Sequence, residues 1–197
     1  MPQELLNTHI LDIGLLPFYM HSLLLSQLLV GSAGMTLIAI DGRAGAGKTT
    51  LAARFLQELS TQQSVAVIHM DDLYAGWGDA LGRSLTSTLE SIVNAHQRHS
   101  TIEIKIFNWS SMRFDSTRII EPVEVLILEG VGAGQKTVRD AGAVLYWLDI
   151  DPELGIQRVL KRDGIHIAEQ MKQWLIDQEI HFLSDKTREN AQHIQSS

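Results

Sequence analysis

Short apolar runs alternate along the chain with longer segments in which apolar residues recur every three or four positions. The short runs are typical of buried strands, and the longer periodic segments are typical of helices. Strands are predicted at 36–40, 65–68, 123–128 and 144–148, with a half-exposed strand at 101–107. Helices are predicted at 47–60, 84–98 and 167–183, with another that opens at 151–153. This alternation favours a three-layer α/β/α fold with a mostly parallel, roughly five-stranded sheet.

The segment ahead of the first predicted strand is rich in leucine and poor in charge. From Ile13 to Ile40 the chain contains no Asp, Glu, Lys or Arg. Pro17 and His21 inside this stretch argue against a membrane anchor, and the positive charge that a signal peptide requires does not precede it. We expect a helix at 18–30 that is buried or faces a partner. Residues 1–35 would then form a helical segment packed on a domain of residues 36–197.

Composition narrows the range of functions. A chain of 197 residues with 45% hydrophobic content is long enough for one well-buried domain and short for two. A net charge of −7 argues against nucleic-acid partners and anionic membranes. The absence of cysteine excludes thiol catalysis, disulfides and cysteine-ligated zinc, and the eight histidines form no HExxH pair. We expect a cytoplasmic protein without a membrane partner, and a homo-oligomer stays open.

A phosphate-binding motif is the strongest signal in the chain. Gly42, Gly47, Lys48 and Thr49 fill the pattern Gly-x-x-x-x-Gly-Lys-Ser/Thr. Glycines let backbone N–H groups turn towards phosphate oxygens, Lys48 adds a positive charge, and the Thr49 hydroxyl can reach a magnesium ion. The predicted ATP-binding residues are Gly42, Arg43, Ala44, Gly45, Ala46, Gly47, Lys48, Thr49 and Thr50. No guanine-reading Asn/Thr-Lys-x-Asp motif follows in the sequence, which favours ATP over GTP.

Carboxylates follow two of the predicted strands. Asp71 and Asp72 come after the strand at 65–68, and Glu129 directly follows the strand at 123–128. Ligands of open parallel sheets bind beyond the carboxyl ends of the strands, so these side chains should lie near the phosphate loop. We expect one aspartate to be catalytic and the other to cap a turn. Glu129 is suited to hold magnesium or to polarise a water, because a charge after so apolar a run needs a partner.

Aromatic residues lie where the rim of a substrate pocket is expected. The segment 75–82 is punctuated by glycines, carries Trp77, and is more typical of a lid or pocket rim than of a helix. Phe107 and Trp109 come at the end of the strand at 101–107. The two rings either stack on a base or cover the core.

Basic residues are concentrated on the helix that opens at 151–153. In kinases, a cluster such as Arg158 and Arg162 closes over the phosphates and offsets the charge of the transition state, whereas Lys161 is expected on a solvated face. An acceptor with its own phosphate would need several further arginines in the pocket. Those available are scattered, at 83, 98, 113 and 118.

Five segments of the chain occur in a characteristic order. They read IDGRAGAGKTT, HMDDLY, FNW, LILEGVGAG and YWLDIDPELGIQRVLKRDG. In this order they resemble the uridine kinase branch of the P-loop kinases, over residues 36–163. The otherwise polar end of the chain, 184–197, is expected to be poorly ordered, although 187–194 is weakly similar to the short last strand of that family. The resemblance implies a P-loop NTPase fold and transfer of the ATP γ-phosphoryl group to a nucleoside-like hydroxyl.

The resemblance also implies roles for individual residues. Asp71, which matches the Asp-x-hydrophobic-Tyr step of the family, would receive the proton of the acceptor hydroxyl. The catalytic residues would be Asp71, Lys48, Arg158 and Arg162, with the two arginines in a lid. The magnesium-side residues would be Thr49, Glu129 and Asp71. It would make Tyr74 part of the acceptor pocket. From their own positions in the sequence, the further acceptor-binding residues are predicted to be Trp77, Phe107, Trp109 and Arg113.

The chain departs from the family at the elements that recognise base and ribose. Phe107, Asn108 and Trp109 stand where uridine kinases carry Tyr-Asp-Phe, and Met112 stands where they carry His. The β-hairpin that the family inserts after the Asp-Tyr step is not recognisable in the sequence. The resemblance therefore supports kinase chemistry better than it supports uridine as the substrate.

The resulting prediction is an ATP- and Mg²⁺-dependent kinase that acts on a small hydroxyl-bearing, nucleoside-like acceptor. One alternative keeps the kinase chemistry but changes the acceptor to a nucleoside monophosphate or another small metabolite. An alternative from a different class is a nucleotide-dependent switch or assembly factor, with the segment 18–30 as its partner interface.

Overall fold

The computed structural model describes residues 35–196, so the helix expected at 18–30 lies outside the described residues. The elements are, in chain order, β1 (Thr36–Gly42), α2 (Lys48–Leu59), β2 (Val65–His69), the 3-10 helix η2 (Met70–Asp72), α3 (Arg83–Gln97), β3 (Ile102–Asn108), β4 (Arg113–Ile120), β5 (Val125–Glu129), α4 (Lys136–Asp140), β6 (Val144–Asp149), α5 (Pro152–Asp163), η3 (Ile165–Ile167), α6 (Ala168–Asp185), η4 (Arg188–Asn190) and β7 (His193–Ser196). In this part of the chain, no helix combines the length and the apolar character that a membrane span requires.

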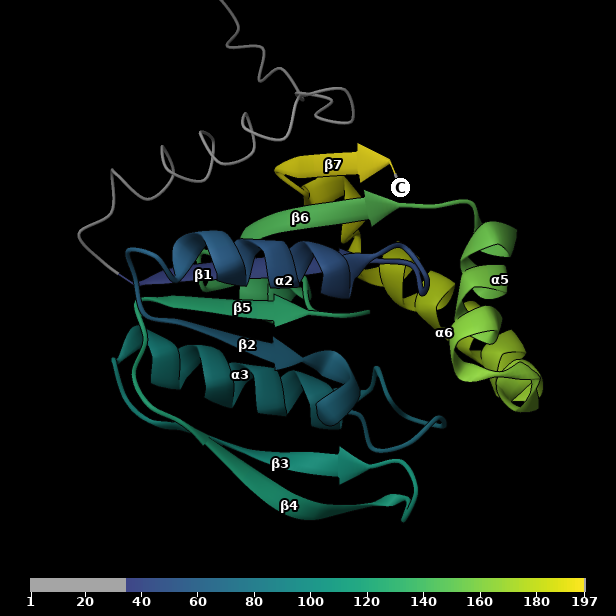
Figure 1. The fold of residues 1–197 in the computed structure, drawn as a ribbon, viewed down its shortest axis with the longest axis horizontal. Helices are drawn as coiled ribbons and strands as arrows, with labels where there is room; N and C mark the ends of the chain where they lie inside the picture. The colour runs from purple at the N-terminus through teal and green to yellow at the C-terminus, as the bar shows by residue number, and fades with distance from the viewer. Residues whose placement is uncertain (1–34, 197) are drawn as a thin grey trace, which may run out of the picture.

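A five-stranded sheet forms the centre of the fold. Its strand order is β2-β5-β1-β6-β7, and every neighbouring pair is parallel. The arrowheads of the strands therefore point to one side, where α5 and the first turns of α6 lie (Figure 1). This arrangement confirms the predicted α/β fold and its mostly parallel sheet.

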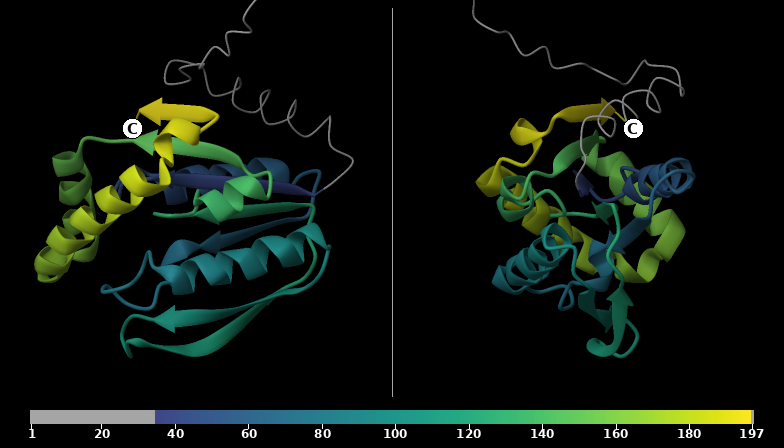
Figure 2. Two further views of the ribbon diagram at one scale, coloured as in Figure 1. Left: turned by 180° about the vertical axis from the view of Figure 1, so that it is seen from behind. Right: turned by 90° about the vertical axis from the view of Figure 1, so that its left-hand side faces the viewer.

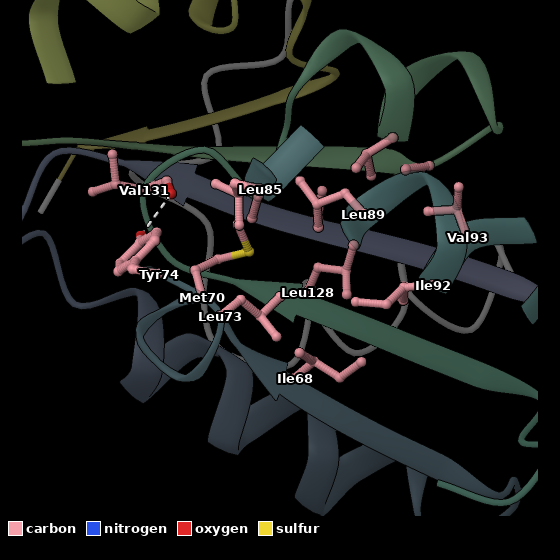
Figure 3. Packing of buried hydrophobic residues seen from close by; sticks show 14 of the residues in the cluster. Ile68, Met70, Leu73, Tyr74, Leu85, Leu89, Ile92, Val93, Leu128 and Val131 are labelled. Carbon is pink, nitrogen blue, oxygen red and sulfur yellow. Dashed lines mark hydrogen bonds between the residues drawn. The ribbon is translucent and has the colours of Figure 1, made fainter. Parts of the chain in front are cut away.

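The two faces of the sheet bury different sets of side chains. On β1, Ile38 and Ile40 pack with residues of α2, whereas Leu37 and Ala39 pack with residues of α3 and α6. Figure 2 shows α2 and α3 on opposite sides of the sheet. The packing between α3 and the ends of β2 and β5 is drawn in Figure 3. The strands are apolar on both faces because helices cover both, which is why they read as continuous apolar runs.

The end of the chain contains the last turn of α6, η4 and β7, so the prediction of a poorly ordered tail at 184–197 is wrong over residues 184–196. The side-chain oxygen of Gln192 accepts a hydrogen bond from the Leu145 N–H at 2.7 Å, ahead of β7. The ring of His193 then stacks on Tyr146 at 4.4 Å between centroids. These contacts to β6 hold a segment whose polar composition did not predict a strand, although the weak similarity at 187–194 to the last strand of the uridine kinases did.

The sequence predicted only one of the two strands of a second sheet. The half-exposed strand at 101–107 is confirmed as β3, but it pairs antiparallel with β4 in a separate two-stranded sheet. A hairpin is therefore present, although the sequence did not reveal it. All residues of β4 except Ile120 are exposed, so the strand has none of the alternation that marks a half-buried strand.

Helix α6 buries a different face from the one predicted. The spacing of apolar residues in the sequence predicts an apolar side made of Met171, Trp174, Leu175, Ile180 and Leu183. Met171 and Trp174 are buried, but Ile180 and Leu183 are exposed by 61% and 74%. The fully buried Gln178 lies one turn after Trp174 instead. This polar side chain is buried where it contacts the phosphate loop, because Gln178 Oε1 accepts a hydrogen bond from the Ala44 N–H.

Candidate active site

Most of the predicted site residues line one cavity of about 780 Å³. Those that line it are Ala44, Gly45, Gly47, Lys48, Thr49, Thr50, Asp71, Tyr74, Trp77, Trp109, Glu129, Arg158 and Arg162. Residues that the sequence had not assigned to a site also line it, namely Ser110, Met112, Gly130, Val131, Val159, Asp163, His166, Ile167, Met171 and Trp174. The predicted residues that are not among the lining residues are Gly42, Arg43, Ala46, Phe107 and Arg113.

The phosphate loop connects β1 to α2 and is closed around its own lysine. Gly42 has a φ of +133°, and a Cβ at this position would lie 2.3 Å from the carbonyl oxygen of Leu148. Only glycine fits such a backbone approach. Lys48 Nζ donates to the carbonyl oxygens of Gly42 at 2.9 Å and Arg43 at 2.8 Å. Burial lowers the pKa of Lys48, and the neighbouring carboxylates partly offset this effect.

Thr49 and Glu129 meet at the start of α2. The Thr49 hydroxyl donates to Glu129 Oε1 at 3.2 Å, and His69 Nδ1 lies 2.5 Å from the same oxygen. Only 6% of the Glu129 side chain is exposed. The hydrogen bond to Glu129 raises the pKa of His69. A hydroxyl beside a buried carboxylate is a set of oxygen donors of the kind that Mg²⁺ binds.

The structure separates the two aspartates of η2. Asp71 lines the cavity, whereas Asp72 is not among its lining residues. Desolvation by the surrounding protein raises the pKa of the Asp71 carboxyl, and the Lys48 ammonium partly offsets the rise. The indole N–H of Trp109 donates to the backbone oxygen of Asp71 at 3.0 Å, which ties the hairpin to this turn.

Aromatic rings form another part of the cavity wall. The Tyr74 hydroxyl donates to the Val131 carbonyl oxygen at 2.7 Å (Figure 3), and the Tyr74 ring lies 5.3 Å from that of Trp174. Trp77 lies 6.1 Å from Trp174 and 5.1 Å from Trp109, measured between ring centroids. The rings come from the loop after η2, the hairpin and α6, so no single sequence segment contained this wall.

Two residues that were predicted to bind the acceptor, Phe107 and Arg113, lie on the β3–β4 hairpin and do not line the cavity. The Phe107 ring is 6% exposed and lies 5.1 Å from the Trp109 ring, which it supports. Arg113 is exposed on β4. Phe107 therefore covers the core, which is one of the two roles considered for the aromatic pair. Trp109 instead lines the cavity, where a base could stack.

Helix α5 contacts the phosphate loop through backbone. A Cβ on Gly45 would lie 2.3 Å from the carbonyl oxygen of Gly155, so the two glycines permit direct contact. One and two turns further along α5, Arg158 and Arg162 line the cavity. Arg158 Nη1 lies 3.4 Å from the Gly45 carbonyl oxygen, and Arg162 pairs with Asp163 at 2.6 Å. Lys161, expected on a solvated face, is exposed and is not among the lining residues.

A buried carboxylate that the sequence analysis did not assign supports the loop after β5. Asp41 is fully buried and accepts hydrogen bonds from the N–H groups of Gly42 at 2.7 Å, Gly132 at 3.0 Å and Gly134 at 2.8 Å. Burial raises the pKa of Asp41. Two features of the sequence could have indicated this role of Asp41. It stands at the end of an apolar strand, and the run at 130–134 is rich in glycine.

Helix α6 also reaches the phosphate loop. The Ala44 N–H donates to Gln178 Oε1 at 3.1 Å. The Arg43 guanidinium donates to both carboxylate oxygens of Glu179, at 2.6 and 2.9 Å. The side chain of Arg43 is thereby turned towards α6. The amphipathic pattern of α6 gave no indication of these contacts.

The chain is similar in sequence and in fold to known kinases. Over 146 residues the chain is 29% identical to a uridine kinase of Staphylococcus haemolyticus. The aligned region covers 66% of this chain and 70% of that protein. A structure described as a possible uridine kinase from Bacillus stearothermophilus has a TM-score of 0.62 at 19% identity, over 90% of this chain and 98% of that one. A candidate fructose transport system kinase from Silicibacter has a TM-score of 0.61 at 18% identity, over 88% and 97%. No protein-family model matches the chain.

The fold, the phosphate loop and these relatives define a P-loop kinase, which is a phosphotransferase. Within that class the chain is similar in sequence and fold to uridine kinases.

Proposed function

We propose that the protein transfers the γ-phosphoryl group of ATP to a hydroxyl of a small, unphosphorylated, nucleoside-like acceptor. The observation that carries the proposal is the composition of one cavity. Lys48, the Thr49–Glu129 pair and Asp71 line it together with three tryptophans. The first group suits a nucleoside triphosphate and phosphoryl transfer, and the tryptophans suit a flat organic acceptor.

Residues of the phosphate loop would hold the ATP phosphates. Backbone N–H groups at the start of α2 provide donors, and the Lys48 ammonium provides positive charge. Thr49 and Glu129 would hold Mg²⁺, because their oxygens are adjacent and of the type this ion prefers. When bound, Mg²⁺ would offset the charge of the β- and γ-phosphates. Arg158 and Arg162 would approach the same phosphates from α5.

Asp71 would orient the acceptor and accept its proton. The acceptor oxygen forms a bond to the γ-phosphorus, the bond between that phosphorus and the β,γ-bridging oxygen breaks, and ADP leaves. The hydroxyl proton passes to the Asp71 carboxylate. A carboxylate with a raised pKa is a better proton acceptor than an ordinary aspartate, while the Lys48 ammonium favours its ionised form. Most of the rate would come from placement and charge.

The arginines argue for an acceptor without its own phosphate. Arg118, on β4, donates to the backbone oxygen of Val67 at 3.0 Å, away from the cavity lining. The other scattered arginines, at 83, 98 and 113, are not among the lining residues either. This supports a nucleoside-like hydroxyl over a nucleoside monophosphate. Phosphate recognition would need arginines beyond the two of α5.

The test is ATP consumption by the purified protein with Mg²⁺, measured against nucleosides, nucleoside monophosphates, sugars and small hydroxy acids, with an acceptor-free control. We expect turnover that requires an unphosphorylated hydroxyl compound, with a phosphorylated product detected by mass spectrometry. Turnover that is equal with and without an acceptor would contradict the kinase proposal and favour the nucleotide-dependent switch. Turnover confined to nucleoside monophosphates would contradict the proposed acceptor class.

A further inference from the structure

Two consecutive residues of α6 contact two consecutive residues of the phosphate loop. Gln178 accepts the hydrogen bond of the Ala44 N–H at 3.1 Å, and Glu179 pairs with Arg43 through two contacts of 2.6 and 2.9 Å. More than 130 residues separate the partners in sequence. The contacts are therefore a property of the tertiary fold, not of the phosphate-loop motif.

The loop needs an external support because of its composition. Gly45 and Gly47 both have positive φ values, of +81° and +89°, and glycines lose more conformational freedom on ordering than other residues do. Binding a phosphate chain requires several loop N–H groups to point in fixed directions at once. A contact that holds the loop in this shape before binding reduces the entropy lost on binding.

Gln178 is placed to provide such support. Its side chain is fully buried, so its carbonyl oxygen has little freedom to leave the Ala44 N–H. The Arg43–Glu179 pair is more open, with 24% and 39% of the two side chains exposed. Solvent screens such a pair and reduces its contribution. The hydrogen bond of Gln178 should therefore matter more than the ion pair of Glu179.

We propose that Gln178 and Glu179 are positioning residues that hold the phosphate loop in its nucleotide-binding shape. The proposal rests on the proposed function in that the bound group is the phosphate chain of a nucleotide. Trp174, one turn before Gln178 on α6, lines the cavity and contacts the Tyr74 and Trp77 rings. The same helix thus joins the aromatic wall to the loop.

The first test is the affinity for a non-hydrolysable ATP analogue with Mg²⁺, measured by calorimetry on the full chain without an acceptor. Gln178→Met keeps the side-chain length but removes the oxygen, and we expect about tenfold weaker binding. Glu179→Gln should weaken binding about twofold to threefold. Glu169→Gln is the matched control, because Glu169 forms an ion pair with Lys172 on the exposed side of α6.

The second test needs no nucleotide. Hydrogen exchange at the Ala44 amide, followed by NMR, should be faster in Gln178→Met than in the wild type. Gln178→Glu retains an acceptor oxygen at the same position, so it should restore the protection of this amide. Thermal unfolding of each variant, measured in parallel, separates a local change in the loop from a general loss of stability.

The outcomes distinguish this inference from the proposed function. Unchanged exchange at Ala44 in Gln178→Met, or an affinity loss that Glu169→Gln reproduces, would overturn the positioning role. The expected changes in exchange and affinity would support it, even if the acceptor panel showed no phosphoryl transfer. The exchange experiment also applies if a variant is less stable, because protection of Ala44 is compared with that of amides in the sheet.

Discussion

The Thr49 hydroxyl donates a hydrogen bond to the Glu129 carboxylate over 3.2 Å, although the two residues are 80 positions apart in the sequence. The parallel pairing of β1 with β5 brings the two residues together. β1 and β5 are neighbours with Ile40 opposite Glu129, and Thr49 lies on the helix that follows β1. A strand end and a helix start are therefore brought to one point by the parallel pairing.

Glu129→Gln should raise the Mg²⁺ concentration needed for half-maximal turnover by about tenfold or more, because an amide oxygen binds Mg²⁺ less strongly than a carboxylate. The measurement is a Mg²⁺ titration at saturating ATP and acceptor. Glu124→Gln, at an exposed carboxylate near the start of β5, is the control and should leave the titration unchanged. An unchanged Mg²⁺ requirement in Glu129→Gln would exclude Glu129 from the magnesium site.

Lys48→Met should reduce phosphoryl transfer by about 10²-fold to 10³-fold, since the loop loses the buried positive charge that, in the proposed function, stabilises the ATP phosphates. Single-turnover kinetics measure the effect on the chemical step. Lys161→Met removes a charge of the same sign from the exposed side of α5 and should be nearly silent. Equal losses in the two variants would indicate a general charge effect.

Asp71→Asn should lower the rate constant of transfer by about 10²-fold to 10⁴-fold while the ATP analogue still binds. The matched variant is Asp72→Asn, which changes the neighbouring residue of η2 outside the cavity lining. In the wild type, kcat/KM should fall as pH is lowered through the raised pKa of Asp71, because only the ionised carboxylate accepts a proton. Retained transfer in Asp71→Asn would move the role of base to another group.

Acid should destabilise the fold through His96. The His96 ring is 3% exposed, and its Nε2 lies 3.0 Å from the Thr36 carbonyl oxygen. Burial lowers the pKa of His96 below its ordinary 6.5, so the unfolded chain takes up the proton more readily and stability rises with pH in this window. The free energy of unfolding should decrease as pH falls below about 6.5. Denaturant unfolding at several pH values measures this dependence.

His96→Gln keeps a donor near Thr36 and does not titrate, so its unfolding free energy should depend less on pH than that of the wild type. His69 acts in the opposite direction, because its hydrogen bond to Glu129 raises its pKa. Comparison of the two proteins removes this contribution, since both contain His69. Identical pH dependence would show that His96 does not carry the effect.

Gly155→Ala should weaken nucleotide binding by separating α5 from the phosphate loop. The added Cβ would lie 2.5 Å from the Ala44 carbonyl oxygen, which is backbone and cannot turn away. Gly78→Ala is the control, because a Cβ there would meet no atom within 4 Å. Calorimetry with the ATP analogue compares the two. Equal affinities would mean that the loop tolerates displacement of α5.

The central sheet and the phosphate loop could be read from the sequence because their signals are local. A strand such as β5 is buried on both faces, and the glycine-lysine-threonine spacing specifies the loop without reference to other segments. β4 could not be read, because it is exposed along nearly its whole length and is held by pairing with β3.

Parts of the site depend on tertiary packing and were therefore not predictable. Met171 and Trp174 were identified as apolar positions of a helix, but the sequence did not indicate that this helix lines the cavity. Gln178 was not assigned because a buried glutamine is visible only once its partner, the Ala44 N–H, is known. Arg113 shows the converse, since its charge suggested a pocket residue and the hairpin exposes it on β4.

The tryptophans that line the cavity allow ligand binding to be followed by intrinsic fluorescence. Trp77, Trp109 and Trp174 line the cavity, whereas Trp147, the remaining tryptophan, is 1% exposed in the core. Indole emission depends on local polarity, so a compound that enters the cavity would alter the signal of three emitters while the fourth provides a constant background. Compound libraries could thus be screened for an acceptor by intrinsic fluorescence, without a label and before any turnover assay exists.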